Sequence, residues 1–488
     1  MKPEIEQMSP SEPVQHVKAA ETRIEENQEP PQHASLASSM MRGDRVLWGI
    51  YFILIFISIV EMYSASSTLA YKSASASDPT FRHVRHILIG LCVIIVSQNM
   101  GRKAFPGWGF LIYGLGMILV VLLPFLGNSM KGAHRDILGI QPVEFIKIGT
   151  IMLAAMLITR HDIWYQRLGA YFRHNTPLKR YLLLLVTVAL PCLFMAPQNL
   201  SSAIIIGLAS FFLMFIGEVP WRYLWRTLMV VAIAGALGIA ALYGLHVYTE
   251  SCGEQGIKPI SLGPVNRAYT WESRLFGSDS KPLWEQDMNG DNSQVIHAHM
   301  ALANSYPFGR FIGNSKLRDY LPEAYSDYIY AIIFEEIGWI GATFILFLYL
   351  FLLWRCYIIA RRSHNLFHRL IMIGLPLIIV IQALIHIGVC TGAMFVTGQP
   401  LPLISRGGSS IIFTSLSFGL MFAMSRIIEN EAHDEEGSPI TQNTQTTQTT
   451  PITQTTPITQ TTQTTPITQT TPITQTTPTT PITQTTPI

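Results

Sequence analysis

The chain has 488 residues, of which 33 are basic and 31 acidic, giving a formal net charge of +2. Charged residues make up 13% of the sequence, against about 25% in an ordinary soluble domain, and hydrophobic residues make up 49%. These values exclude a set of soluble domains. They also argue against nucleic acid as a partner, because the basic residues are few and scattered. The five cysteines fall mostly in apolar stretches, which excludes a disulfide-stabilised scaffold.

Apolar stretches long enough to cross a bilayer recur along the chain, since a spanning helix needs about 20 such residues. We therefore expect an all-α polytopic membrane protein with about ten transmembrane helices. The predicted spans cover residues 46–66, 85–100, 105–127, 143–160, 181–197, 200–217, 227–248, 328–354, 370–391 and 409–428.

Lys and Arg residues gather at alternate ends of these spans, for example Arg42, Arg102, Arg222 and Arg361. Cytoplasmic loops of membrane proteins carry such an excess, so the bias places both termini in the cytoplasm. The connection at about 250–327 then faces outward. Its length indicates a functional loop rather than a simple link.

Polar tails flank the predicted membrane domain at 43–430. Residues 1–42 are rich in Glu, Pro, Gln and Ser, and residues 431–488 end in a low-complexity repeat of Thr, Gln, Pro and Ile. Such segments bury too little apolar area to fold, so we expect both to be disordered in the cytoplasm. The repeat is either a tail without a catalytic role or a docking segment for a cytosolic partner.

The first candidate site residues are Glu144 and Lys147, in the stretch Gln-Pro-Val-Glu-Phe-Ile-Lys at 141–147. Ionisable groups inside spans are costly and are therefore functional candidates. Because the two residues are three apart, they share one face of a helix. They predict either a structural ion pair or part of a polar cavity that binds substrate or a cation.

A second group of carboxylates lies where the outer loop enters the eighth span. Asp327 follows the stretch Leu-Pro-Glu at 321–323, and Glu335 and Glu336 lie about two turns into the span. A partly desolvated carboxylate that can be reached from outside suits general-base catalysis, whereas an Asp in this position also suits helix capping. At least one of the two glutamates must face protein or water.

The segment 397–410 combines Pro, small residues and one cation, Arg406, just before the tenth span. Irregular backbone at membrane depth is tolerated only where it is buried in protein or lines a cavity. The segment therefore predicts either a structural turn or an anion site. The anion site would use Arg406 and the backbone N–H groups of 407–410, which include Ser409.

Further cations lie in predicted outer loops, against the usual charge bias: Lys131, Arg135, Arg267 and Arg274. They indicate either an anionic ligand or solvated loop charges. The sequence has no Walker loop, dinucleotide fingerprint, Cys/His metal cluster or nucleophile elbow, so an ATP-driven pump has no support.

Taken together, three motifs resemble the SEDS family (shape, elongation, division and sporulation). They are Gln-Pro-x-Glu-Phe-x-Lys at 141–147, Leu-Pro-Glu-x-x-x-Asp at 321–327 with Glu-Glu-x-Gly at 335–338, and Pro-Leu-Pro-Leu-Ile-Ser-x-Gly-Gly-Ser-Ser at 400–410. The resemblance runs from about Gly43 to Arg426. The stretch Met-Tyr-Ser-Ala-Ser-Ser at 62–67 and the two tails resemble the division branch, FtsW, more than the elongation branch, RodA.

This resemblance implies the SEDS fold and a peptidoglycan glycosyltransferase that polymerises lipid II at the outer face of the cytoplasmic membrane, at the division septum. It implies Asp327 as the catalytic residue, and a class B penicillin-binding protein and other division membrane proteins as partners. No cofactor is evident. A divalent cation is compatible with the leaving-group chemistry, although the sequence contains no dedicated protein site for one.

The expected substrate-binding residues combine the family matches with the outer cations; they are Arg135, Glu144, Lys147, Glu323, Arg406, Ser409, Arg267 and Arg274. The chain departs from the family pattern at Asp136, His386 and Arg406, where Trp, Asn and Tyr are usual, and at 196–203, where an acid is missing. A lipid II flippase and a non-catalytic scaffold remain alternatives to the polymerase.

Overall fold

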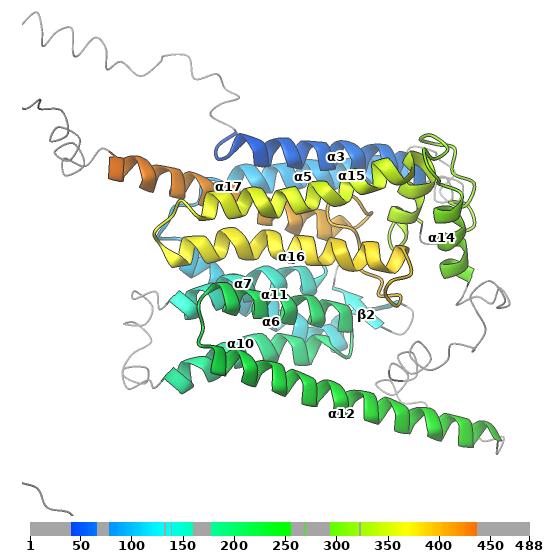
Figure 1. The fold of residues 1–488 in the computed structure, drawn as a ribbon, viewed down its shortest axis with the longest axis horizontal. Coiled ribbons are helices and arrows are strands. Elements are labelled where there is room, and N and C mark those ends of the chain that lie inside the picture. The colour runs from blue at the N-terminus through cyan, green and yellow to red at the C-terminus, as the bar shows by residue number, and fades with distance from the viewer. Residues whose placement is uncertain are drawn as a thin grey trace, which may run out of the picture. The chain divides into compact units, whose positions relative to one another are not determined.

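The computed structural model describes residues 41–65, 78–130, 133–137, 139–159, 177–254, 268, 293–321 and 324–436. Within them the chain forms a helical bundle with one small β-hairpin (Figure 1). In chain order the elements are α3 (Arg45–Ala65), α5 (Asp78–Ser97), α6 (Phe105–Leu126), β1 (Asn128–Met130), β2 (Ala133–Asp136), α7 (Pro142–Thr159), α10 (Pro177–Met195), α11 (Leu200–Ile216), α12 (Trp221–Glu254), α14 (Ser293–Ala303), α15 (Ile329–Ala360), α16 (Leu366–Cys390) and α17 (Gly408–Glu436).

Each of the ten predicted spans corresponds to one of these helices, so the prediction of a polytopic helical membrane protein is confirmed. Among the described residues, eight helices are long and apolar enough to cross a membrane, and α10 and α11 contain shorter apolar stretches. The short antiparallel hairpin β1–β2 and the helix α14 add to the predicted fold. Most of the two predicted tails lies outside the described residues, and the predicted domain boundaries stay predictions.

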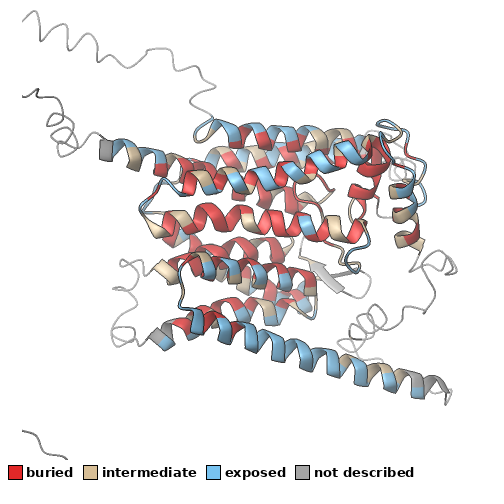
Figure 2. Ribbon diagram, in the orientation of Figure 1, coloured by how far each residue is buried: buried red, intermediate tan, exposed pale blue. Residues whose placement is uncertain are grey.

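The helices α16 and α17 lie at the centre of the bundle, whereas α12 lies at its edge. In the most apolar 18 consecutive residues of each helix, 83% of the residues of α16 and of α17 are buried, whereas none of those of α12 is (Figure 2). α7 packs against α6, α10, α11 and α16, and α17 packs against α5. A helix that is apolar on all sides fits such a central position, because it meets protein all round.

The helix α15 consists of two pieces that meet at Gly338, where the backbone has a φ of 76°. A Cβ atom on Gly338 would lie 2.5 Å from the backbone carbon of Phe308, so only glycine permits this close approach. On the other side of the contact, Gly309 also has a left-handed φ, of 71°. The kink therefore lets the segment 307–310 pack directly on the first turns of α15.

Gly338→Ala is expected to destabilise the protein by about 1–3 kcal/mol, because alanine would be forced into a left-handed conformation and against the Phe308 backbone. Thermal unfolding of the purified protein in detergent measures the change. The matched control is Gly114→Ala in α6, where an added Cβ meets no atom within 4 Å. The control is expected to leave stability unchanged or to raise it by up to about 1 kcal/mol, because alanine is the better helix former. Equal unfolding midpoints for the two variants would contradict the strain at the kink.

Candidate active site

Asp327 lies in the turn 324–328 that leads into α15. Its side chain is half-buried, and Ser326 Oγ donates a hydrogen bond to its Oδ1 at 3.1 Å. The N-cap residue of α15 is Tyr328, and no side chain forms a capping bond there. Asp327 therefore does not cap the helix, and Ser326 Oγ is the one hydrogen-bond donor to its carboxylate among the residues that the structure describes.

The segment 399–406 packs directly against this turn. Ser405 Oγ donates to the carbonyl oxygen of Ser326 at 2.8 Å, and the backbone N–H of Arg406 donates to that of Tyr325 at 2.9 Å. The Arg406 guanidinium lies over the Tyr325 ring, 5.1 Å from its centroid. Two motifs whose hydrogen-bonded residues Ser326 and Ser405 are 79 residues apart in the sequence thus form one site, which holds both a carboxylate and a cation.

Side chains from three helices hold the irregular backbone of 399–403 in place. Each donates a hydrogen bond to a different carbonyl group of the segment, which replaces the bonds that a helix would make. The bonds run from His386 Nδ1 to Gln399 O at 2.7 Å, from Gln382 Nε2 to Pro400 O at 2.9 Å, from Tyr349 Oη to Pro402 O at 2.5 Å and from Ser58 Oγ to Leu403 O at 2.6 Å. The prediction that this segment lies buried against other helices is confirmed.

Ser409 and Ser410 lie in the first turn of α17 and are buried. Ser410 Oγ is a buried atom without a hydrogen-bond partner among the described residues. The N–H groups of this first turn face the same end of the bundle as Arg406, and a helix N-terminus with a neighbouring cation favours an anion.

Glu144 and Lys147 form a buried ion pair in the first turns of α7, with 2.8 Å between Lys147 Nζ and Glu144 Oε1. Lys147 Nζ also donates to Gln382 Oε1 at 2.5 Å. Because Gln382 in turn bonds Pro400, the pair is connected to the segment that packs on the Asp327 turn.

Glu144, one member of this ion pair, borders a small polar cavity of about 40 Å³, which is enough for a few water molecules. The lining includes Gln141, Glu144, Asn199 and Gln399. Gln399 Nε2 donates to Asn199 Oδ1 at 2.9 Å and to Ser202 Oγ at 3.0 Å. The pair is therefore a buried structural ion pair, as the first alternative predicted, and its Glu144 also lines a polar cavity. Binding of a substrate or a cation in that cavity stays a prediction.

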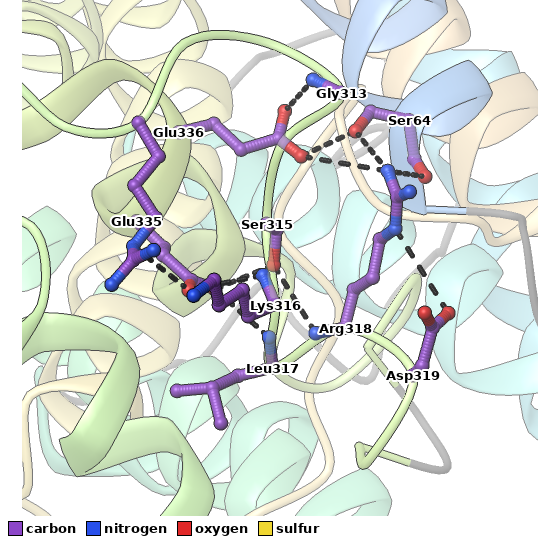
Figure 3. Close-up of polar contacts among 10 residues, drawn as sticks. Ser64, Gly313, Ser315, Lys316, Leu317, Arg318, Asp319, Glu335 and Glu336 are labelled. Atoms are coloured by element: carbon purple, nitrogen blue, oxygen red, sulfur yellow. Dashed lines mark hydrogen bonds and ion pairs between the residues drawn. The ribbon is translucent and has the colours of Figure 1, made fainter.

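Glu335 and Glu336 are both completely buried, and both bind the outer segment 310–318 (Figure 3). Glu335 accepts hydrogen bonds from Ser315 Oγ at 2.5 Å and from the backbone N–H groups of 316 and 317, and Arg310 Nε lies 3.7 Å from it. Glu336 accepts hydrogen bonds from Ser64 Oγ and from the N–H of Gly313. Arg318 Nη1 bonds the Ser64 carbonyl oxygen at 3.1 Å and lies 3.9 Å from Glu336. The two glutamates thus hold the segment 310–318 in place shortly before the chain reaches Asp327.

The structure does not reach every predicted site residue. Glu323, Arg267 and Arg274 lie outside the described residues. The backbone of Arg135 lies in strand β2, and its side chain is not described. The turn 324–328 and the segment 399–410 bring together three of the predicted site residues: Asp327, Arg406 and Ser409. The ion pair of Glu144 and Lys147 is connected to that segment through Gln382.

Sequence reasoning missed Gln382 and Gln399, and it treated His386 only as a departure from the family. A signal was present, because Gln382 and His386 are polar residues four apart in an otherwise apolar span and so share one face. Among the residues that the structure describes, no group of three or more His, Cys, Asp and Glu side chains is arranged to hold a metal ion.

A family model described as "Cell cycle protein", for FtsW, RodA and SpoVE, matches residues 44–430. Peptidoglycan glycosyltransferase MrdB of Escherichia coli K12 is 28% identical over 367 residues, which cover 73% of this chain and 89% of MrdB. Probable peptidoglycan glycosyltransferase FtsW of Haemophilus influenzae is 28% identical over 393 residues, 78% of this chain and 89% of that protein. Stage V sporulation protein E of Bacillus subtilis is 28% identical over 394 residues, 78% and 97% of the two chains.

Solved structures share the fold. A chain of a peptidoglycan synthase complex that coordinates polymerization and crosslinking aligns with a TM-score of 0.54 and 22% identity, over 79% of this chain and 98% of that chain. The rod shape determining protein RodA of Thermus thermophilus aligns with a TM-score of 0.51 and 21% identity, over 79% and 97% of the two chains. The alignments cover nearly the whole of each solved chain, so the fold of those chains is contained in this one.

Proposed function

The chain belongs to the family of cell cycle proteins that includes FtsW, RodA and SpoVE, a family of peptidoglycan glycosyltransferases, and we propose that it polymerises lipid II into glycan strands during septal cell-wall synthesis. The observation that carries the proposal is the packing of the Asp327 turn against the segment 399–406, which brings a free carboxylate and the Arg406 cation to one end of the bundle. The FtsW relative aligns over more of the chain than MrdB does, which favours the septal role over elongation.

In the proposed reaction, Asp327 is the general base. It takes the proton from the 4-hydroxyl of the N-acetylglucosamine of lipid II as that oxygen attacks C1 of the N-acetylmuramic acid at the growing end. The attack displaces undecaprenyl pyrophosphate, and an α-linked donor gives a β-1,4 link with inversion. Ser326, which donates to Oδ1, orients the carboxylate so that Oδ2 faces the acceptor.

Cations stabilise the pyrophosphate leaving group as its charge develops. We assign this role to two neighbouring groups near the Asp327 turn: the Arg406 guanidinium and the N-terminus of α17, which includes Ser409. Arg135, Arg267, Arg274 and Glu323 remain predicted substrate contacts. The pair Glu144–Lys147 and the cavity beside it belong to the polar interior that receives the sugar end of the substrate.

The proposal includes a membrane position and a partner. Both termini lie in the cytoplasm by the distribution of Lys and Arg, which puts Asp327 at the outer face, where lipid II is consumed. A class B penicillin-binding protein is the proposed partner, together with other septal membrane proteins. The fold that this chain shares with a chain of a peptidoglycan synthase complex supports such an assembly.

The test is glycan synthesis by the purified chain and its cognate class B penicillin-binding protein, with lipid II supplied in detergent. The expected result is long glycan strands from the pair, detected by gel electrophoresis, and little product from either protein alone. The partner must lack glycan-polymerising modules of its own. If the pair makes no strands but the chain moves labelled lipid II across vesicle membranes, the flippase replaces the polymerase as the function.

A further inference from the structure

A second cavity, of about 990 Å³, lies at the opposite end of the bundle from Asp327. It is open on one side and is lined by residues 41–46 and 48 around the start of α3, by the end of α15 and by the second half of α17. From the kink at Gly338 to Arg355, the first residue of α15 that lines the cavity, the helix rises by about 26 Å, which separates this cavity from the Asp327 turn by most of the hydrocarbon thickness of a bilayer. The cavity therefore takes no part in the proposed glycosyl transfer.

The lining of this cavity is strongly basic. Five arginines line it, against two acidic residues; the seven are Arg42, Arg45, Arg355, Arg362, Arg426, Asp44 and Glu429. Only one of the five is neutralised by a close ion pair among the described residues: Arg355 Nη2 lies 2.5 Å from Asp44 Oδ2. Arg42 Nη1 donates to Asn99 Oδ1 at 3.0 Å and Arg426 Nη2 to the Met100 carbonyl oxygen at 3.2 Å, so neutral groups hold these two cations in place.

Arg42 and Arg426 line the same cavity and carry like charges. Arg45 and Arg362 are exposed, and no hydrogen bond or ion pair within the described part of the chain engages their side chains. Like charges gathered in one cavity are stabilised by an anion between them, and guanidinium groups suit phosphate because they bind its oxygens in pairs.

Most of the remaining wall is apolar. Val46, Ile359 and Ile428 line the cavity beside the arginines. Val46, on α3, is 37% exposed. The volume is far larger than a single phosphate needs and lies at the upper end of the range for sites that hold a whole organic ligand. A soluble anion would leave this apolar wall uncovered, whereas a lipid covers it with its acyl chains.

We propose that this cavity binds the phosphate headgroup of an anionic phospholipid of the inner leaflet, held by Arg45 and Arg362 with Arg42 and Arg426 behind them. The acyl chains lie along the apolar wall formed by α3 and α15. Basic pockets between spanning helices on the cytoplasmic side are the usual sites for such headgroups. The proposal rests on the orientation given above and not on the glycosyltransferase activity.

The experiment is native mass spectrometry of the full chain, equilibrated with equal amounts of phosphatidylglycerol and phosphatidylcholine. Wild type is expected to retain phosphatidylglycerol in preference, and Arg45→Gln/Arg362→Gln is expected to lower that preference about 25-fold, or about fivefold for each arginine. Because both side chains are exposed and unpaired, their loss does not threaten folding. The matched control is Arg361→Gln, next in sequence, whose guanidinium lies 5.8 Å from the Tyr357 ring and outside the cavity lining.

A second readout is the thermal unfolding midpoint, which phosphatidylglycerol is expected to raise in wild type and in Arg361→Gln but not in the double variant. Displacement of the lipid by inorganic phosphate at about tenfold excess would overturn the proposal in favour of a soluble anion. Equal retention of the two lipids by wild type would also overturn it, as would equal losses in the control and the double variant.

Discussion

Asp327→Asn is expected to lower the rate of glycan polymerisation by about 100- to 10,000-fold, which is the usual contribution of a positioned general base. The amide has nearly the same shape as the carboxylate, and its oxygen still accepts the hydrogen bond from Ser326 Oγ. It cannot take a proton from the attacking hydroxyl. The variant should therefore fold and bind its partner normally while losing the chemical step. Initial rates of lipid II consumption, with the partner present, measure the effect.

The control for this variant is Ser326→Ala, which removes the hydrogen bond to Oδ1 but keeps the base. It also leaves the bond from Ser405 Oγ to the Ser326 carbonyl oxygen in place. A loss of one orienting bond is expected to lower the rate less than tenfold, which is the size of one ordinary hydrogen bond. Equal rates for Asp327→Asn and wild type would remove Asp327 from the mechanism, and equal losses in both variants would make it a structural residue.

The spans could be predicted from the sequence because apolar length alone decides whether a helix can cross a bilayer. The errors occur where charge interrupts that pattern. The second span was predicted to begin at residue 85, but α5 begins at Asp78, because Arg82 and His83 lie inside the helix and interrupt the apolar run. In the same way, α12 begins at Trp221 rather than at residue 227, since Arg222 and Arg226 lie in its first turns.

The site could be predicted only in part, because its geometry depends on contacts between distant segments. The sequence indicates that Asp327 and Arg406 are unusual, but nothing in it shows that the two turns share hydrogen bonds. The same holds for Gln382, whose two partners, Lys147 and Pro400, lie on either side of it in the sequence. The residue was overlooked because a single polar residue in an apolar helix has no visible partner until the helices are packed.

The prediction for Glu335 and Glu336 shows the opposite case, in which physical cost alone was informative. Carboxylates inside a span must meet protein or water, so at least one had to be buried against polar groups. Both are, because the segment 310–318 folds back and presents its backbone N–H groups to them. The partner segment itself could not be predicted, because nearly every residue has a backbone N–H group and the sequence does not show which of these groups will meet a carboxylate.

Lys147→Met is expected to destabilise the protein by about 3–5 kcal/mol, because it leaves the buried Glu144 charge without its partner. It also removes the donor to Gln382 Oε1. Glu144→Gln/Lys147→Met removes both charges and is expected to recover most of that loss, since two neutral side chains of similar size carry no uncompensated charge. The unfolding midpoints of the two variants in detergent measure the difference, and equal midpoints would contradict a buried charge pair.

Polymerisation by the double variant then separates the two roles of this pair. If the pair only holds the start of α7, a stable double variant makes glycan at the wild-type rate. We expect it instead to be folded and to polymerise at least tenfold more slowly. Glu144 lines the polar cavity, and Lys147 donates a hydrogen bond to Gln382. Gln382 in turn bonds the Pro400 carbonyl oxygen of the segment that packs on the Asp327 turn, so loss of the pair is expected to misplace the base. A charge pair that serves stability alone can be replaced by neutral residues without loss of activity, whereas a pair that positions a loop against the catalytic base cannot.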